Sequence, residues 1–533
     1  MRTGVLFFTS AVLFTPAPAF AGQIDPHPDV VSTSAAATDL TTADYCGPAS
    51  SNPVADGEPI AVRIPPAPPF IVGSIPASWW RDPPVSDPTW RLTLSGFVWA
   101  KPIAQRAHVD GQLRSLSSIV GQAVKFHQQN PDPDTSSNGW GEGTAMKRLD
   151  AENCLYSLMP TPALRSSMVE DARVLLGPRY YGPPRTLVHN HGLMANLQLF
   201  RAGTLLNISA WKSRAIQRMV SEAPLAYSAQ GVTFEQSSEY QLVNINLWTQ
   251  AANYLRQSGY TSAADSIDRT LARALVAFRW MTEPDGRVVQ IGDSTKRLGD
   301  PHPTYTSRVF RDDSTGWIVG RWSWRDANTT YYTVRYGPPQ RAHGQHDRAG
   351  GVTWSPTGVR VLVGPGKFNY DSSTKWFAYQ FGPQSHNVAI PNGRSVTAGG
   401  GSVAASLIQA PVHAWTIKDE MFGIDHLRNI NVNRATQAIR VTDYFAGASW
   451  WHQYWHLDPA WRLVSKSSTR LRFSHPSGKR LAVTTTGRLS NVVRGEDSPV
   501  QGWNFPDFGS KVSACEIVIR SYGKSSITSF QVY

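Results

Sequence analysis

The hydrophobic period of this sequence changes once, near residue 300, and that change limits the folds that the chain can adopt. Before it, apolar residues recur every three to four positions in Leu113–Val124, Leu242–Leu255 and Ile267–Phe278, a spacing that predicts amphipathic helices. After it, apolar and polar residues alternate in Tyr331–Arg335 and Gly358–Val363, which predicts strands. A run of helices followed by a run of strands indicates two domains and argues against a parallel α/β sheet.

Composition and local patterns divide the chain into four segments. With 533 residues, 41% of them hydrophobic, the chain can bury more than one core. Residues 1–21 combine Arg2, an apolar run and the small-residue site Ala19–Ala21, as a signal peptide cleaved near Ala21 does. Residues 22–85 form a Pro-rich N-terminal arm. We expect a helical domain over residues 86–300 and a strand domain over residues 301–533.

The charge and the cysteine usage restrict the compartment and the partner. No later apolar stretch approaches the roughly 20 residues of a membrane-spanning helix, so we expect a secreted or periplasmic protein without a membrane span. The formal net charge of +12 favours an anionic partner. Because Lys/Arg-dense blocks and zinc-finger spacing are missing, we expect an acidic polysaccharide and no nucleic acid. Cys46, Cys154 and Cys515 allow one disulfide, whose pairing stays open.

Six short motifs are spread over both halves of the chain in a fixed order. They are Asn190-His191-Gly192, Ser237-Ser238-Glu239-Tyr240, Ile291-Gly292-Asp293-Ser294, His343-Gly344-Gln345-His346-Asp347, Gly364-Pro365-Gly366 and Ser385-His386-Asn387. In order and approximate spacing they resemble the heparinase II/III-like polysaccharide lyases over roughly residues 90 to 460. The resemblance implies an incomplete α/α toroid followed by an antiparallel β-sandwich, in agreement with the change of period.

The resemblance also implies a reaction, β-elimination beside a uronic acid, which leaves unsaturated uronate ends and needs no cofactor. Asn190 is our candidate for neutralising the substrate carboxylate, as a preorganised donor. His191 would take the C5 proton and Tyr240 would protonate the departing oxygen. Where that proton faces the leaving oxygen, a single tyrosine can serve as both base and acid. The stereochemistry of the substrate therefore decides how these roles are shared.

By the same resemblance, the strand domain contributes a further tyrosine or histidine to the catalytic site. The matching residues are His346, Tyr370 and Tyr379, and the sequence does not rank the two tyrosines. Of the two histidines in the His343–Asp347 motif, we expect His346 rather than His343 to face the site.

The family commonly holds a metal ion through His, Asp and His, and the resemblance points to His346 and His386 as ligands for zinc or another divalent ion. The family's aspartate, found in an Asp-Pro-Gly sequence, is replaced by Gly364. A site of two histidines alone is weak. It would need Asp347 or Asp371 as a substitute ligand.

Three residues are candidates for binding the substrate. Arg185 and Arg341 flank motifs and carry the paired N–H donors that suit a carboxylate. Trp140 offers a ring for sugar stacking, although tryptophan more often fills a core.

Two other functions fit the same scaffold. A glycoside hydrolase would use two carboxylates, but Glu142 and Glu239 have no acidic partner near the motifs. A non-catalytic secreted carbohydrate-binding protein would retain the fold without the reaction, and Gly364 keeps that alternative open. The formation of an unsaturated uronate distinguishes the lyase from both.

Overall fold

The computed structural model describes residues 40–533 except 66, 86, 134–137, 142, 178–187, 301–304 and 340. The expected signal peptide, the first part of the arm and Arg185 therefore lie outside the described residues. Among the residues described, no helix is long and apolar enough to cross a membrane.

The contacts within the chain divide it into two compact units. The first comprises Met1–Ala226 and Asn246–Arg269, and the second comprises Tyr227–Ile245 and Thr270–Tyr533. Two helices, α9 (Ser238–Gln257) and α10 (Thr261–Trp280), contribute residues to both units. The helices of the main run end with α10, and the first strand after it, β3, begins at Val309.

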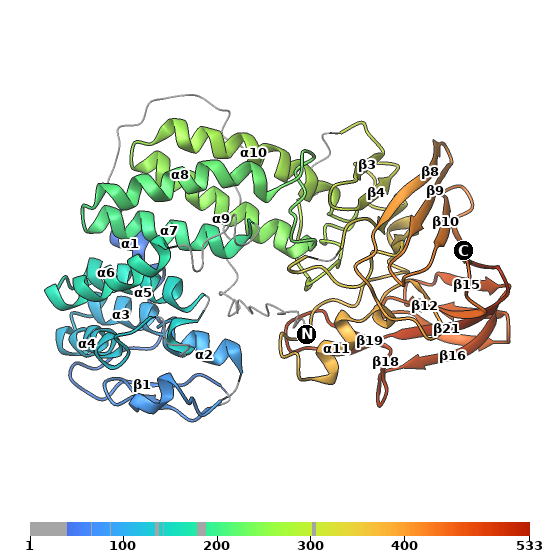
Figure 1. The fold of residues 1–533 in the computed structure, drawn as a ribbon. Coiled ribbons are helices and arrows are strands. Elements are labelled where there is room, and N and C mark those ends of the chain that lie inside the picture. Colours follow the sequence, from blue (N-terminus) through green and yellow to red (C-terminus); the bar gives the residue numbers. More distant parts are fainter. Residues whose placement is uncertain are drawn as a thin grey trace, which may run out of the picture. The chain divides into compact units, whose positions relative to one another are not determined.

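The first unit is built from helices that pack as neighbouring pairs (Figure 1). They are α1 (Thr42–Cys46), α2 (Pro88–Ser95), α3 (Ala100–Val109), α4 (Leu113–Gln129), α5 (Thr144–Leu158), α6 (Pro162–Leu176), α7 (Asn190–Leu205) and α8 (Ser209–Ala226). Helix α5 packs against α3, α6 and α7, and α7 packs against α8. Leu116, Ile119 and Val120 are buried along one face of α4, which confirms the helical period predicted there. The short strands β1 (Ala61–Val62) and β2 (Phe70–Ile71) pair with each other before α2.

Covalent and ionic contacts tie the helices of this unit together. A disulfide between Cys46 and Cys154 joins α1 to α5, while Cys515 is a buried free thiol. His127 of α4 lies 2.9 Å from Glu152 of α5 and 3.6 Å from Asp171 of α6. Because buried charges require partners, this cluster fixes the three helices relative to one another.

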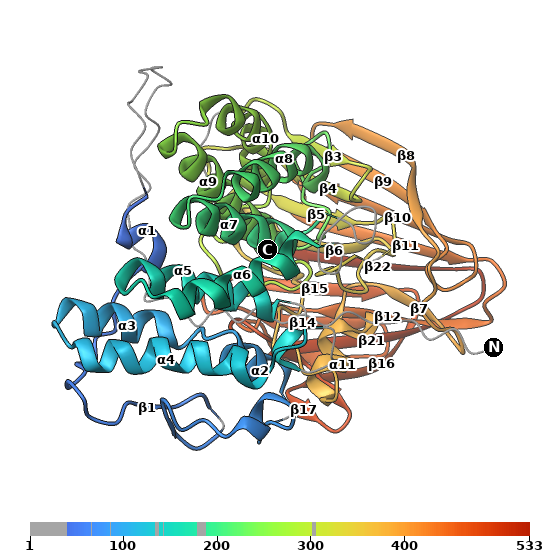
Figure 2. The same cartoon turned by 60° about the vertical axis from the view of Figure 1, so that its left-hand side comes forward.

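The second unit contains three antiparallel sheets (Figure 2). Their orders are β13-β14-β15-β22-β11-β10-β9-β8, β16-β21-β12-β7 and β3-β4-β5-β6. The strands are β3 (Val309–Asp312), β4 (Trp317–Arg321), β5 (Tyr331–Arg335), β6 (Gly351–Ser355), β7 (Ala389–Pro391), β8 (Gly401–Gln409), β9 (Val412–Asp419), β10 (His426–Asn433), β11 (Ala438–Phe445), β12 (Trp450–His456), β13 (Arg462–Lys466), β14 (Arg470–Ser474), β15 (Arg480–Thr485), β16 (Arg488–Arg494), β21 (Cys515–Tyr522) and β22 (Ser525–Val532). Two-residue strands form the pairs β17 (Glu496–Asp497) with β18 (Val500–Gln501) and β19 (Trp503–Asn504) with β20 (Val512–Ser513).

One apolar core joins these sheets. Trp354 of β6, Trp415 of β9 and Trp455 of β12 belong to it, together with residues of β11, β14, β15 and β22. Alternate residues of β9, β10 and β11 face this core and the solvent, as expected of a sheet with one buried face. The second unit is therefore a β-sandwich.

The strands predicted from alternation are confirmed in one segment and corrected in another. Tyr331–Arg335 is β5. Gly358–Val363 is wrong as a regular strand: the segment enters from a turn in which Gly358 has φ +72°, and Leu362 makes only isolated bridges, to Trp354 and Leu457.

Candidate active site

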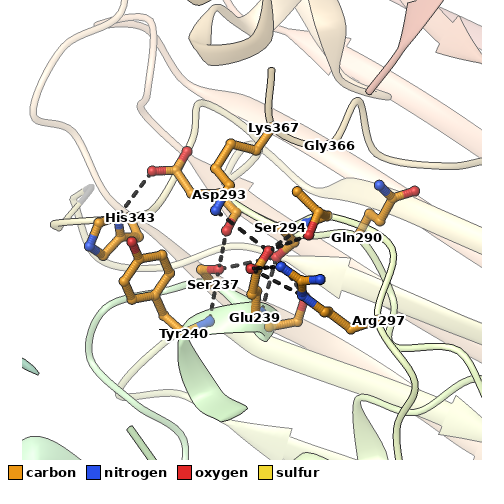
Figure 3. A network of polar contacts seen from close by, with 12 residues as sticks. Ser237, Glu239, Tyr240, Gln290, Asp293, Ser294, Arg297, His343, Gly366 and Lys367 are labelled. Atoms are coloured by element: carbon orange, nitrogen blue, oxygen red, sulfur yellow. Dashed lines mark hydrogen bonds and ion pairs between the residues drawn. The ribbon is translucent and has the colours of Figure 1, made fainter. Parts of the chain in front are cut away.

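Tyr240 lies in the first turn of α9, and hydrogen bonds to the segment of residues 291–295 fix that turn (Figure 3). The Ser237 hydroxyl accepts a hydrogen bond from the Tyr240 backbone N–H at 3.3 Å and donates one to the Asp293 carbonyl at 3.0 Å. The hydroxyls of Ser238 and Ser294 lie 2.9 Å apart. Hydrogen bonds between the Ser237–Tyr240 motif and the Ile291–Ser294 motif therefore fix the position of Tyr240.

Gly292 allows three segments of backbone to meet beside Tyr240. Its φ is +63°, and a Cβ there would lie 2.6 Å from the carbonyl oxygens of both Gln236 and His343. Only glycine combines this conformation with such a close approach. The Ile-Gly-Asp-Ser motif thus brings the loop that contains Arg341 and His343, called the His343 loop, to the start of α9.

The phenol of Tyr240 contacts two other rings. Its hydroxyl lies 2.9 Å from the hydroxyl of Tyr370, a hydrogen bond. Its ring stacks on the imidazole of His343, with centroids 3.3 Å apart and planes 11° apart. His343 is held in turn by carboxylates, with Nδ1 3.0 Å from Asp293 Oδ2 and Nε2 3.7 Å from Glu235 Oε2.

Burial and nearby carboxylates set the charge state of the two tyrosines. Burial raises the pKa of the Tyr240 phenol well above its usual value, although the hydrogen bond from Tyr370 opposes this. Burial and the neighbouring Tyr240 raise the pKa of Tyr370 in the same direction. Both side chains are therefore neutral phenols at neutral pH, and such a group is a proton donor rather than a base.

One lysine faces this tyrosine pair. Lys367 Nζ lies 5.6 Å from the ring centroid of Tyr240 and 5.3 Å from that of Tyr370. The same ammonium lies 3.5 Å from Glu239, which also pairs with Arg297 at 2.9 Å. A positive charge therefore lies near both rings and is partly neutralised by Glu239.

The structure places the other candidates of the strand domain in different surroundings. Tyr379, in α11 (Lys375–Phe381), is buried and donates a hydrogen bond to Glu516 at 2.9 Å. His346 packs edge-on against Phe381, and its Nδ1 is buried without a hydrogen-bond partner among the described residues. Tyr370 is the candidate that contacts Tyr240. The histidine that contacts Tyr240 is His343, which lies in the same motif as His346.

The metal set implied by the family is only partly present. Nδ1 of His346 and Nε2 of His386 are both buried and unpartnered in the described chain. Burial, together with Arg348, lowers the pKa of His346 to about 4, and burial and neighbouring histidines lower that of His386 well below its usual value. Both imidazoles are therefore in the neutral form that binds metals.

A third ligand is the missing part. At Gly364 a Cβ would lie 2.1 Å from the Gln290 carbonyl oxygen, so no side chain fits there. Asp347 faces Arg335 at 3.5 Å, and Asp371 accepts hydrogen bonds from Ser373. Over the part of the chain that the structure describes, no carboxylate completes a three-ligand group with these histidines. The residues present do not fit the family's metal site, and no catalytic step is assigned to a metal here.

Asn190 and His191 belong to the first unit, at the beginning of α7. His189 caps this helix, because its Nδ1 accepts a hydrogen bond from the His191 backbone N–H at 3.2 Å. Both candidates are buried, and Gly192 and Asn196 bring the turn next to Glu222, with Asn196 Nδ2 3.4 Å from its carboxylate. The motif is thus a buried, polar start of helix α7.

The candidate substrate-binding residues differ in exposure. Trp140 is fully buried, donates a hydrogen bond to the Asn130 carbonyl and stacks under Arg148, so its ring fills the core, as most tryptophans do. Arg341 is half-buried and lies over the Phe234 ring at 5.0 Å, two residues before His343.

Sequence reasoning missed part of the Tyr240 group. The sequence favours His346 over His343, and it gives no role to Asp293, Lys367 or Glu235. The signal for His343 and Asp293 was available, since both lie in the motifs that carried the resemblance. Nothing in the local sequence marks Lys367 or Glu235, which reach the site through the fold.

Family models match almost the whole described chain. The heparinase II/III N-terminus model matches residues 74–303, and the model of the heparinase II/III-like C-terminal domain matches residues 306–533. The chain belongs to the heparinase II/III-like family. This family member is a polysaccharide lyase, which confirms the class of enzyme expected from the motifs. A comparison with curated protein sequences returns no match.

Solved structures show the fold of this heparinase II/III-like lyase. A crystal structure of heparinase III matches with a TM-score of 0.71 and 15% identity, covering 85% of this chain and 79% of that one. A mutant of the heparan sulfate lyase HepC from Pedobacter heparinus matches with a TM-score of 0.64 and 17% identity, covering 91% and 85%. The incomplete α/α toroid followed by an antiparallel β-sandwich is therefore confirmed.

Proposed function

We propose that this lyase cleaves a polysaccharide containing uronic acid by β-elimination. The C5–H bond and the C4–O bond of the uronate break, a C4–C5 double bond forms, the proton leaves with a base, and the glycosidic oxygen receives a proton from an acid. The observation that carries the proposal is the neutral phenol of Tyr240, which is hydrogen-bonded to Tyr370 and stacked on His343. The product would be an unsaturated uronate at a new chain end.

Tyr240 is the acid in this proposal. The phenol carries its proton at neutral pH and can give it to the departing oxygen. The phenolate left behind would be stabilised by the Tyr370 hydroxyl and by Lys367. His343, fixed by Asp293, supports the ring of Tyr240 and keeps its hydroxyl in one direction.

Asn190 and His191 supply the other half of the reaction in the same proposal. The Asn190 amide would bind the substrate carboxylate and spread the charge of the enolate-like intermediate, a role typically worth about 3 kcal/mol in the transition state. The His191 imidazole would take the C5 proton, since a neutral imidazole nitrogen is a common general base.

Charge and disulfide chemistry support an anionic substrate and an exported enzyme. The net charge of +12 attracts an acidic polymer, and Arg341, beside the His343 loop, is the arginine that we propose to bind a substrate carboxylate. The disulfide Cys46–Cys154 is a bond typical of oxidising compartments.

A panel of uronate polymers and a neutral glucan tests the proposal. Elimination makes a double bond conjugated to the carboxylate, which absorbs in the ultraviolet. We expect absorbance to rise with at least one uronate polymer, and to stay flat with the glucan. New reducing ends without this absorbance would identify a hydrolase and contradict the proposal.

A further inference from the structure

The outward face of the sheet β16-β21-β12-β7 carries aromatic rings and arginines. Along β12, Trp451 and Trp455 are fully buried, whereas the alternate residues Trp450, His452 and Tyr454 are only partly buried. Since successive side chains of a strand point to opposite faces, these three lie on the face away from the core. The labels β12, β21 and β16 in Figure 1 mark the strands concerned.

Arg520 of β21 lies between two of the rings on this face. In register, Tyr522 pairs with Trp450 and Arg520 pairs with His452. The Arg520 guanidinium carbon lies 3.9 Å from the Trp450 ring centroid and 5.1 Å from that of Tyr522. Stacking of this kind fixes the plane of the guanidinium and leaves the N–H groups at its edge available for binding.

Arg520 carries a charge that no described carboxylate neutralises. Within the described chain, Arg520 Nε is buried without a hydrogen-bond partner, and no carboxylate forms an ion pair with this guanidinium. Arg488 of β16, which pairs with Arg520 in register, is exposed and adds a second positive charge. An oriented, unpaired guanidinium beside a second arginine is complementary to an anion.

The face is open at one end and covered at the other. At the open end, Tyr522 is 58% exposed. At the far end, His456 Nε2 bonds to the Gln384 carbonyl and Glu516 is covered by Tyr379. We call the open part, formed by Trp450, His452, Arg520, Tyr522 and Arg488, the Arg520 face.

We propose that the Arg520 face is a second, non-catalytic binding site for an anionic sugar residue of a polysaccharide. The ring of Tyr522 suits the C–H face of a sugar, while the Arg520 fork binds the anion. That anion is a uronate carboxylate or a sulfate ester, since each can offer two oxygens to the paired N–H donors of a guanidinium. The inference depends on the proposed function only for the identity of the polymer. By binding a chain away from the reacting bond, the face would raise the local concentration of substrate.

Binding measurements in a Tyr240→Phe background test this site without cleavage. Arg520→Ala and, separately, Tyr522→Ala should weaken binding to an acidic polymer by about tenfold or more. Arg472→Ala is the matched control, because it removes an exposed strand arginine from β14, in the other sheet. With a short uronate oligosaccharide, calorimetry should give two bound molecules per chain, and one after Arg520→Ala.

The outcomes separate this inference from the proposed function. Affinity within twofold of the parent after Arg520→Ala, a single oligosaccharide in both proteins, or equal binding of a neutral glucan would each overturn the Arg520 face. Comparing a polymer of uronate alone with a sulfated polymer shows which anion is bound, and stronger binding of either over the glucan supports the site. A protein that binds two oligosaccharides but never forms the double bond would contradict only the proposed elimination.

Discussion

The chemistry of this lyase depends on a few side chains whose environment changes their usual behaviour. Tyr240 is the clearest case, because a phenol that is buried among Tyr370, His343 and Lys367 holds its proton. Burial disfavours the phenolate, and the hydrogen bond with Tyr370 opposes that effect.

Replacing Tyr240 by phenylalanine tests this role at a single atom. Tyr240→Phe keeps the ring stacked on His343 and removes only the hydroxyl. We expect turnover to fall by about a hundredfold or more, because general acid catalysis of this kind contributes about that much, with binding retained. Tyr336→Phe removes a hydroxyl from another buried tyrosine of the same unit and should keep its turnover. Equal losses in the two variants would show that the effect is structural.

Asn190→Ala tests the neutralising amide. The substitution should lower kcat by about a hundredfold, since the charge on the substrate carboxylate would no longer be spread onto a donor. The melting temperature should change little, because helix α7 keeps its His189 cap. Near-normal turnover would remove Asn190 from the mechanism.

At the residue scale, the sequence identifies the motifs but not the loop registers. Tyr240 lies in one of the motifs, Tyr370 was implied by the family resemblance, and the hydroxyls of the two residues are hydrogen-bonded to each other. The preference for His346 over His343 was wrong for contact with Tyr240. Sequence alone does not show which of two histidines three positions apart faces inward in an irregular segment. That direction is set by Gly292 and the backbone it contacts.

Among the elements, the Ile291–Ser294 segment is the part on which the site geometry most depends. Gly292→Ala would place a Cβ against the carbonyl oxygens of Gln236 and His343, so we expect lower thermal stability and a large loss of turnover. Gly393→Ala is the control, because Gly393 has a similar φ of +68° with open space around it. Gly393→Ala should therefore lose only the free energy needed to place an alanine at positive φ, about 1 kcal/mol. If both variants behave alike, close approach at Gly292 is not important.

A buried histidine makes the stability of the sandwich depend on pH. Burial opposes charging of His426, but ion pairing with Asp419 and Asp443 outweighs it and raises the pKa to about 9. The stabilisation is therefore complete below the unfolded pKa of about 6.5 and is lost as pH rises through about 9, an effect on the order of 3 kcal/mol.

Urea unfolding followed by tryptophan fluorescence measures this dependence. The free energy of unfolding should fall between about pH 6 and pH 10 in the parent, and by less in His426→Gln, whose side chain does not titrate. Parallel curves for the two proteins would show that His426 does not cause the loss.

Most elements were predictable because the spacing of their apolar residues shows which face of the helix or strand is buried. Leu471–Phe473 and Leu481–Val483 alternate and lie in β14 and β15. Gly358–Val363 alternates equally well but follows the turn at Pro356–Gly358 and has no continuous partner strand. Alternation reports burial, whereas a strand also requires a neighbour with free backbone groups.

At the scale of the whole molecule, one covalent bond closes a long loop in the first unit. Cys46 and Cys154 are 108 residues apart, and closing a loop of that size typically stabilises a protein by about 4 to 5 kcal/mol in the chain-entropy model. A reductant should therefore lower the melting temperature of the parent and leave that of Cys46→Ser/Cys154→Ser unchanged. A reductant effect of equal size in both proteins would assign it to another cause.

For the chain as a whole, the central claim is that this lyase eliminates rather than hydrolyses. Cleavage in water labelled with heavy oxygen, followed by mass spectrometry of the products, tests this most directly. Elimination consumes no water, so the account predicts unsaturated products without the label. Saturated products carrying one heavy oxygen atom at the new reducing end would contradict it.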